Sequence, residues 1–185
     1  MSILTRLDSD AARTALRQAE HSASPELRVE AIAVRAAGSA DGLRDELARL
    51  SVDHDQGIRL AALRTMARYK VKEAGPPLVH HIMSAAFHRL PLDERRLALS
   101  TLHELSPARA ELMAAELCEK STLIGRESLD ETRILAIELL ERTASRKESL
   151  AVLERTSEKW SNSTPVRAAA SRAVAALRGR LEHGR

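Results

Sequence analysis

The chain has 185 residues, 44% hydrophobic and only 2% aromatic, with 29 basic and 26 acidic residues and a single cysteine. This length fits one domain or one short repeat array, and the aliphatic composition, poor in Gly and Pro, predicts an all-α fold. The lone Cys118 excludes an internal disulfide and fits a reducing compartment. No apolar run reaches the roughly 18 residues of a membrane span, and the first residues lack a signal-peptide layout. We therefore expect a cytoplasmic protein with no membrane association.

Apolar residues recur at helical spacing in segments that turn and capping residues separate. In chain order, helices are expected over 10–21, 25–37, 41–50, 55–69, from 75 to a break at Leu90-Pro91, 93–105, from 107 to a turn over 120–128, 129–143, 145–160 and 165–181. Taken in pairs they form five units, at about 1–38, 39–72, 73–105, 106–144 and 145–185. Ser128 with Glu131, and Ser145 with Glu148, have the spacing of capping boxes.

An Arg-x-x-Ala phrase stands near the start of the second helix of every unit. By subtraction, successive copies are 31, 36, 38 and 34 residues apart, and they begin at Arg28, Arg59, Arg95, Arg133 and Arg167. A near-constant period of this size is typical of stacked helix pairs. Each pair can bury its apolar stripe only against a neighbour, so the array is expected to fold as one domain over 1–185.

The phrase SPELRVEAI at 24–32 resembles the second-helix signature of HEAT and HEAT-like repeats, Asp-Pro-x-Val-Arg-x-x-Ala. Residues 55–63 and 164–170 match nearly as well, whereas Glu94 and Thr132 replace the usual buried aliphatic residue in the third and fourth copies. The short period is similar to that of compact bacterial HEAT-like repeats. The resemblance covers nearly the whole chain and implies a right-handed α-α superhelix, a HEAT-like solenoid of about five helix pairs.

The resemblance also implies roles for two sets of positions. In HEAT-like repeats the signature Arg bonds to turn residues of adjacent repeats, so the five repeat arginines are expected to be structural. The second helices line the concave side of such arrays. A helical wheel places positions 3, 4 and 7 after the Arg inward, which leaves positions 2, 5 and 9 for the outward face. The resulting partner-binding ridge comprises Ala61, Arg64, Arg68, Leu97, Ser100, Glu104, Leu135, Glu138, Arg142 and Arg172.

Leu97 and Leu135 of this ridge have two interpretations. With Ala61 and Ala169, which share their position, they could form an apolar strip edged by charged residues, as in a protein-binding groove. Alternatively they belong to the core, since helices inside an array touch neighbours on both sides and need a wide apolar arc. The sequence leaves both interpretations open.

The chain lacks the patterns of an active site. No Cys or carboxylate stands at ligand spacing from a histidine on the same helix, so we expect no metal. The Gly-rich and Walker phosphate loops are absent, so we expect no nucleotide cofactor. We therefore predict that the protein is no enzyme but a scaffold or adaptor that presents a concave helical surface to another protein. No motif identifies that partner or the oligomeric state.

The second interpretation is nucleic-acid binding, as in HEAT-like DNA glycosylases that hold DNA in a basic groove. Basic residues cluster over 64–72 and again over 167–180. Single-stranded binding sites also need aromatic stacking platforms, and Tyr69 and Trp160 lie in different units. Glu104 and Glu138 interrupt the ridge with negative charge. We therefore expect a protein partner rather than nucleic acid.

Overall fold

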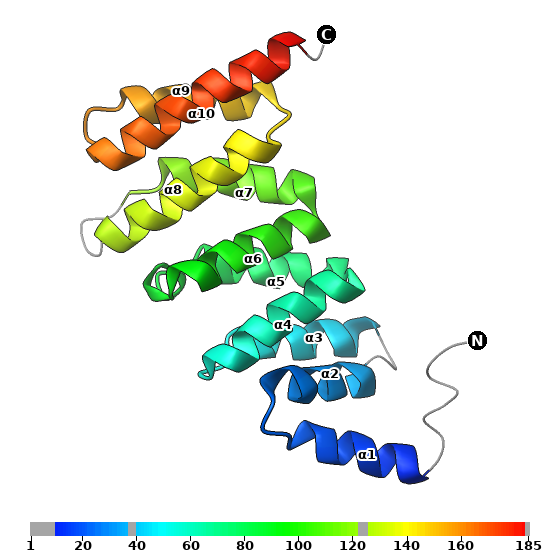
Figure 1. The fold of residues 1–185 in the computed structure, drawn as a ribbon. Coiled ribbons are helices and arrows are strands. Elements are labelled where there is room, and N and C mark those ends of the chain that lie inside the picture. The colour runs from blue at the N-terminus through cyan, green and yellow to red at the C-terminus, as the bar shows by residue number, and fades with distance from the viewer. Residues whose placement is uncertain (1–9, 37–39, 122–125, 184–185) are drawn as a thin grey trace. The chain divides into compact units, whose positions relative to one another are not determined.

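The computed structural model describes residues 10–36, 40–121 and 126–183, and every regular element in these ranges is helical (Figure 1). The described part of the chain contains ten α-helices and two 3₁₀ helices. The prediction of an all-α fold is confirmed. Contacts divide the chain into two compact units, residues 1–78 and 79–185, and the boundary lies inside α5 (Gly75–Ile82).

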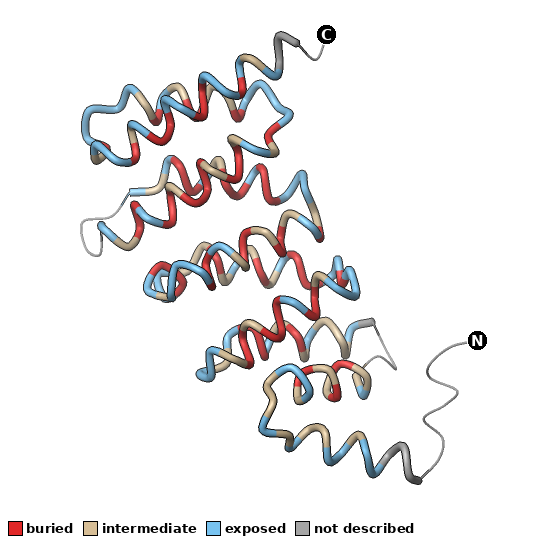
Figure 2. The backbone as a smooth tube through the Cα atoms, viewed as in Figure 1, coloured by how far each residue is buried: buried red, intermediate tan, exposed pale blue. Residues whose placement is uncertain are grey.

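The first unit is built around α2, which packs against α1, α3 and α4. Val29 of α2, Leu47 of α3 and Met66 of α4 are fully buried between these helices (Figure 2). The helices α3 and α4 also pack against each other. The elements of this unit are α1 (Asp10–Glu20), α2 (Pro25–Ala36), α3 (Ala40–Leu50), α4 (Gln56–Tyr69) and the 3₁₀ helix η2 (Lys72–Ala74).

The two ends of α4 are fixed by local signals. Asp55 is the N-cap, and its Oδ1 accepts hydrogen bonds from the N–H groups of Gly57 at 2.7 Å and Ile58 at 3.3 Å. Lys70 ends the helix in the left-handed conformation, with φ of 50°. Gly57 lies where the first turn of α4 approaches α2, since a Cβ added there would stand 2.7 Å from Cγ of Pro25. The start of α4 is therefore held tightly against the start of α2.

The second unit is built around α8, which packs against α6, α7, α10 and the 3₁₀ helix η3. The helix α9 packs against α7 and α10. Phe87, Leu102, Leu117 and Leu140 are fully buried in this core. The elements are η3 (Phe87–Arg89), α6 (Leu92–Leu105), α7 (Pro107–Glu119), α8 (Arg126–Thr143), α9 (Lys147–Glu158) and α10 (Thr164–His183).

One helix is shorter than expected. The helix that begins at Gly75 ends at Ile82 instead of continuing to the Leu90-Pro91 break. The chain turns after Ile82 and forms η3, where the hydroxyl oxygen of Ser84 accepts a hydrogen bond from the N–H of Phe87 at 3.3 Å. This turn places the Phe87 ring in the core, edge-on to His81 with ring centroids 5.3 Å apart.

The two predicted capping boxes are wrong. Ser128 lies inside α8, which begins at Arg126, so it caps no helix. The N-cap of α9 is Arg146 instead of Ser145, and it makes no side-chain cap bond. The buried carboxylate of Glu111 on α7 replaces it, accepting hydrogen bonds from Arg146 N at 3.0 Å and from the hydroxyl of Ser149 at 2.6 Å. A tertiary contact therefore satisfies the start of α9.

Substitution of Glu111 by alanine is expected to lower the free energy of unfolding by about 2–3 kcal/mol. The change leaves a buried hydroxyl and a helix-end N–H group without their acceptor, and each unsatisfied group costs about 1–3 kcal/mol. The measurement is urea denaturation followed by circular dichroism. Glu116→Ala, at an exposed position of the same helix, is the control and is expected to stay within about 0.5 kcal/mol. Equal midpoints for the two variants would contradict the role of Glu111.

Candidate binding groove

Two repeat arginines bond to the turn that precedes their own helix. Nη1 of Arg28 donates to the carbonyl of Ser22 at 2.9 Å. Nη1 of Arg59 donates to the carbonyls of Asp53 at 2.8 Å and His54 at 2.9 Å. The carbonyl groups of these turns accept no hydrogen bond from a helix. The arginines donate to them in place of water.

Three repeat arginines also reach the following helix pair. Nη2 of Arg28 lies 3.6 Å from Oδ2 of Asp55, the N-cap of α4. Nη1 of Arg95 on α6 donates to the carbonyl of Ser128 at 2.8 Å and to the hydroxyl of Thr132 at 2.9 Å, both on α8. Nη2 of Arg133 donates to Asn162 at 2.9 Å, in the turn before α10. Thr132 thus accepts a hydrogen bond from Arg95 where the HEAT-like signature has an aliphatic side chain.

Arg167 is half-buried, as Arg28 is, and its Nε atom is buried without a hydrogen-bond partner among the described residues, as is Nε of Arg95.

Two of the ten predicted ridge residues are buried. Ala61 is 2% exposed and Leu135 is 4% exposed. Of the two interpretations of Leu135, the core interpretation therefore holds, and Ala61 offers little surface to a partner. The reason for Leu135 is that α8 packs against α6 and also against α10, which closes its outward arc. Ala169 is buried in the same way, and Leu97 is half-buried.

The other ridge residues keep contact with solvent. Ser100 and Glu138 are half-buried, and the remaining five are exposed, namely Arg64, Arg68, Glu104, Arg142 and Arg172. The structure brings only some of them together. In the second unit Glu138 pairs with Arg96 at 3.0 Å and its carbonyl accepts from Nε of Arg142 at 3.2 Å. Ser100 turns back onto its own helix, where its hydroxyl donates to the carbonyl of Leu97 at 2.9 Å.

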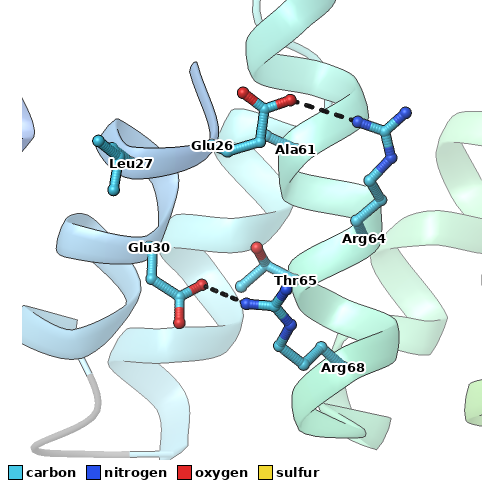
Figure 3. A pocket seen from close by; sticks show the side chains of 7 residues that line it. All are labelled: Glu26, Leu27, Glu30, Ala61, Arg64, Thr65 and Arg68. Atoms are coloured by element: carbon cyan, nitrogen blue, oxygen red, sulfur yellow. Dashed lines mark hydrogen bonds and ion pairs between the residues drawn. The ribbon is translucent and has the colours of Figure 1, made fainter. Parts of the chain in front are cut away.

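In the first unit the ridge residues of α4 line a groove together with α2 (Figure 3). We call it the α2/α4 groove. Its volume is about 160 Å³, and its lining residues are Glu26, Leu27, Glu30, Ala61, Arg64, Thr65 and Arg68. Ala61 forms part of the floor, while the charged side chains stand at the two edges.

Two ion pairs bridge the α2/α4 groove. Nη1 of Arg64 lies 3.4 Å from Oε1 of Glu26, and Nη1 of Arg68 lies 3.5 Å from Oε2 of Glu30 (Figure 3). The side chains of Arg64 and Arg68 are 56% and 70% exposed. Exposed pairs of this kind contribute about 0.2–1 kcal/mol each, so a ligand can open them at small cost.

Exposed apolar surface accompanies these charges. Leu27 is 55% exposed and lines the groove from α2, on the side of the glutamates away from α4 (Figure 3). Tyr69, at the end of α4, is 47% exposed, and its hydroxyl donates to the carboxylate of Glu30. This hydrogen bond is the main cause of a raised pKa of Tyr69, since it favours the protonated phenol. The groove therefore combines apolar side chains with charges of both signs.

Two further hollows lie in the second unit, and no predicted ridge residue lines either. One, of about 500 Å³, is lined by Glu127, Asp130, Glu131, Ile134, Ser163 and Pro165. The other, of about 290 Å³, is lined by Cys118, Glu119, Arg155, Thr156, Lys159 and Asn162. Burial raises the pKa of the Cys118 thiol to about 12, so the nucleophilic thiolate does not form at neutral pH.

The described residues contain no group of three or more His, Cys, Asp or Glu side chains placed to hold a metal ion. In that same part of the chain, no helix combines the length and apolar character that a membrane span requires.

A buried histidine lies beside the repeat arginine of α6. His88 is 8% exposed, and its Nδ1 lies 3.3 Å from the hydroxyl of Thr132. Burial, followed by the nearby charges of Lys120 and Arg95, lowers the pKa of His88 to about 4. The imidazole is therefore neutral in the folded protein near neutral pH.

Acidification is expected to destabilise the protein through His88. In the unfolded chain this residue takes up a proton below about pH 6.5, whereas in the folded chain it does so only near pH 4. Stability attributable to His88 therefore falls as the pH drops from about 6.5 towards 4, by about 2 kcal/mol at pH 5. Urea unfolding at pH 7 and pH 5 measures the slope, and His88→Gln should flatten it. The same slope in both proteins would show that other groups cause it.

The sequence reading missed one side of the groove. Glu26 and Leu27 precede the signature arginine and so fall outside positions 2, 5 and 9, and Glu30 stands at position 2 but is not among the ten ridge residues. The sequence does contain a pattern that predicts these ion pairs. Glu26 and Arg64 are separated by 38 residues, as are Glu30 and Arg68, so opposite charges stand at matching places in the two helices. No family model, curated protein or solved structure matches this chain, so the α2/α4 groove is interpreted from its own residues.

Proposed function

We propose that the protein is a right-handed HEAT-like solenoid that acts as a non-catalytic scaffold or adaptor for another protein. The ten helices of the described residues and the arginine signature that recurs five times in the sequence support this proposal. The single buried Cys118 suits a reducing compartment such as a bacterial cytoplasm.

The observation that carries the proposal is the α2/α4 groove. Leu27, a large apolar side chain 55% exposed, lines it together with a row of charges on each edge. Tyr69, 47% exposed, adjoins it through its hydrogen bond to Glu30. Apolar centres with polar surroundings are typical of protein interfaces. Both edges are helices packed against each other, so little backbone ordering is needed when a partner docks.

The same geometry weighs against nucleic-acid binding at this site. The first basic cluster is centred on Arg64 and Arg68, and each of these arginines forms an ion pair with a glutamate. Phosphate binding draws on unneutralised cations and the release of counterions. A glutamate row beside the arginines would repel the phosphates. We therefore favour a protein partner.

Site-specific photocrosslinking tests the proposal. A photoreactive amino acid replaces Leu27 in one variant and Leu112, on α7, in the other, because these residues are 55% and 56% exposed. In a lysate of the source cells, a discrete protein adduct is expected at position 27 and not at position 112. Mass spectrometry then identifies the adduct. Absence of an adduct at position 27, or equal labelling at both positions, would argue against the groove as the docking site.

A further inference from the structure

The two edges of the α2/α4 groove carry opposite charges in matching register. Glu26 and Glu30 are four residues apart on α2, and Arg64 and Arg68 are four residues apart on α4 (Figure 3). Each row therefore advances by roughly 6 Å along its helix. The two ion pairs join the rows at successive turns. The groove thus has an acidic edge and a basic edge of equal length.

The charges of the Glu26–Arg64 pair are the most accessible to an external partner, and Arg68 is 70% exposed, whereas Glu30 is 31% exposed and also accepts a hydrogen bond from the Tyr69 hydroxyl. The side chains of Glu26 and Arg64 are 61% and 56% exposed, and the pair is 3.4 Å apart rather than in close contact. Loose exposed pairs are weak. A ligand that brings an acid to each arginine and a base to each glutamate would keep every charge paired and add contacts of its own.

The small volume and the helical edges restrict the shape of such a ligand. About 160 Å³ admits side chains but not a whole helix, so the ligand lies over the groove. The backbone groups along α2 and α4 are already hydrogen-bonded within their helices, so an extended segment would find no backbone partner. A helix forms its backbone hydrogen bonds internally. Its side chains four residues apart lie on one face, at the same spacing as the charges along α2 and α4.

We propose that the α2/α4 groove binds an amphipathic helix of a partner protein with opposite charges on its two flanks. One flank carries two acidic residues four apart, against Arg64 and Arg68. The other carries two basic residues four apart, against Glu26 and Glu30. An apolar residue between the flanks lies over Ala61 and Thr65, which line the groove between the two charged rows (Figure 3). This inference rests on the proposed scaffold function and specifies the partner of that same site.

The charge pattern also determines how the groove responds to mutation. Turning a helix end to end exchanges its flanks, so reversing all four charges of the groove would reverse the bound direction without abolishing binding. Reversing one edge alone is more informative. The double variant R64E/R68E has two acidic edges, which match a helix with bases on both flanks.

The test uses the full chain and three synthetic alanine-based helical peptides that share a central leucine. One peptide carries two Glu on one flank and two Lys on the other, the second carries Glu on both flanks, and the third carries Lys on both. Fluorescence anisotropy is expected to show the wild type binding the mixed peptide at least about tenfold more tightly than either other, a preference that salt weakens. The R64E/R68E variant should prefer the Lys peptide.

Equal affinity of the wild type for the three peptides, or no binding of any at millimolar concentration, would overturn the inference. Circular dichroism checks the fold of the variant, whose substituted side chains are exposed. The photocrosslink at position 27 separates this inference from the proposed function. A cellular partner that still crosslinks in R64E/R68E would overturn the charge pattern alone, whereas no crosslink in the wild-type background would count against the scaffold function.

Discussion

Replacement of Arg133 by methionine is expected to lower the free energy of unfolding by about 3–5 kcal/mol. The Arg133 side chain is 5% exposed and joins three parts of the second unit. Its Nε and Nη2 donate to the carbonyl of Cys118 on α7 at 3.1 and 2.7 Å. Nη1 donates to Asp130 on α8 at 3.1 Å, and Nη2 donates to Asn162 before α10 at 2.9 Å. Methionine would leave all three acceptors buried without this donor.

Urea unfolding followed by circular dichroism measures this loss. Arg142→Met is the matched control, because Arg142 lies on the same helix and is exposed, and it is expected to change stability by less than about 0.5 kcal/mol. A similar shift in both variants would mean that the methionine acts through helix propensity or charge and not through the buried hydrogen bonds.

The helices of this fold were predictable because their signals are local. Pro25, Pro107 and Pro165 stand at or next to the first residue of α2, α7 and α10, as expected for a residue that needs no helical N–H partner. Asp55 caps α4 as its side chain predicts. The apolar period then defines the rest of each helix. Nothing in such a signal depends on a residue far away in the sequence.

Features that depend on distant residues were not predictable in this way. Ser145 has the form of a cap, yet Glu111, 34 residues away, supplies the acceptor at the start of α9. The helix α5 ends at Ile82 although its apolar pattern continues, and the turn that follows places the Phe87 ring in the core of the second unit. In both places a tertiary contact prevails over a local preference.

The candidate site likewise combines features that have local signals with features that depend on distant residues. A helical wheel places Arg64 and Arg68 of α4 outward, and both are exposed, but it places Ala61 outward as well, and Ala61 is buried. The wheel treats each helix alone, so it assigns Leu97 and Leu135 to one class although Leu97 is half-buried and Leu135 is in the core. It also gives no pairing between helices, which is why the glutamate edge of the groove was missed.

Leu135→Glu is expected to destabilise the protein by more than about 4 kcal/mol and to unfold the second unit at neutral pH. Leu135 is 4% exposed between helices that pack on both sides of α8. The substitution both removes buried apolar contacts and places an unpaired carboxylate in an apolar environment, and either effect alone costs several kcal/mol. Leu97→Glu, at a half-buried position, is expected to cost about 1–2 kcal/mol, because its carboxylate can reach water.

Thermal and urea unfolding of the two variants, with Leu135→Met as a volume-conserving control expected to cost less than about 1.5 kcal/mol, distinguish core from groove at this position. A folded Leu135→Glu protein with an unchanged midpoint would mean that α8 has an open side, and the binding surface would then include the second unit. The expected loss instead confines any partner contact on α8 to residues such as Arg142 that are exposed. Apolar anchoring would then fall to Leu27 and Tyr69 at the α2/α4 groove, where both side chains already reach solvent.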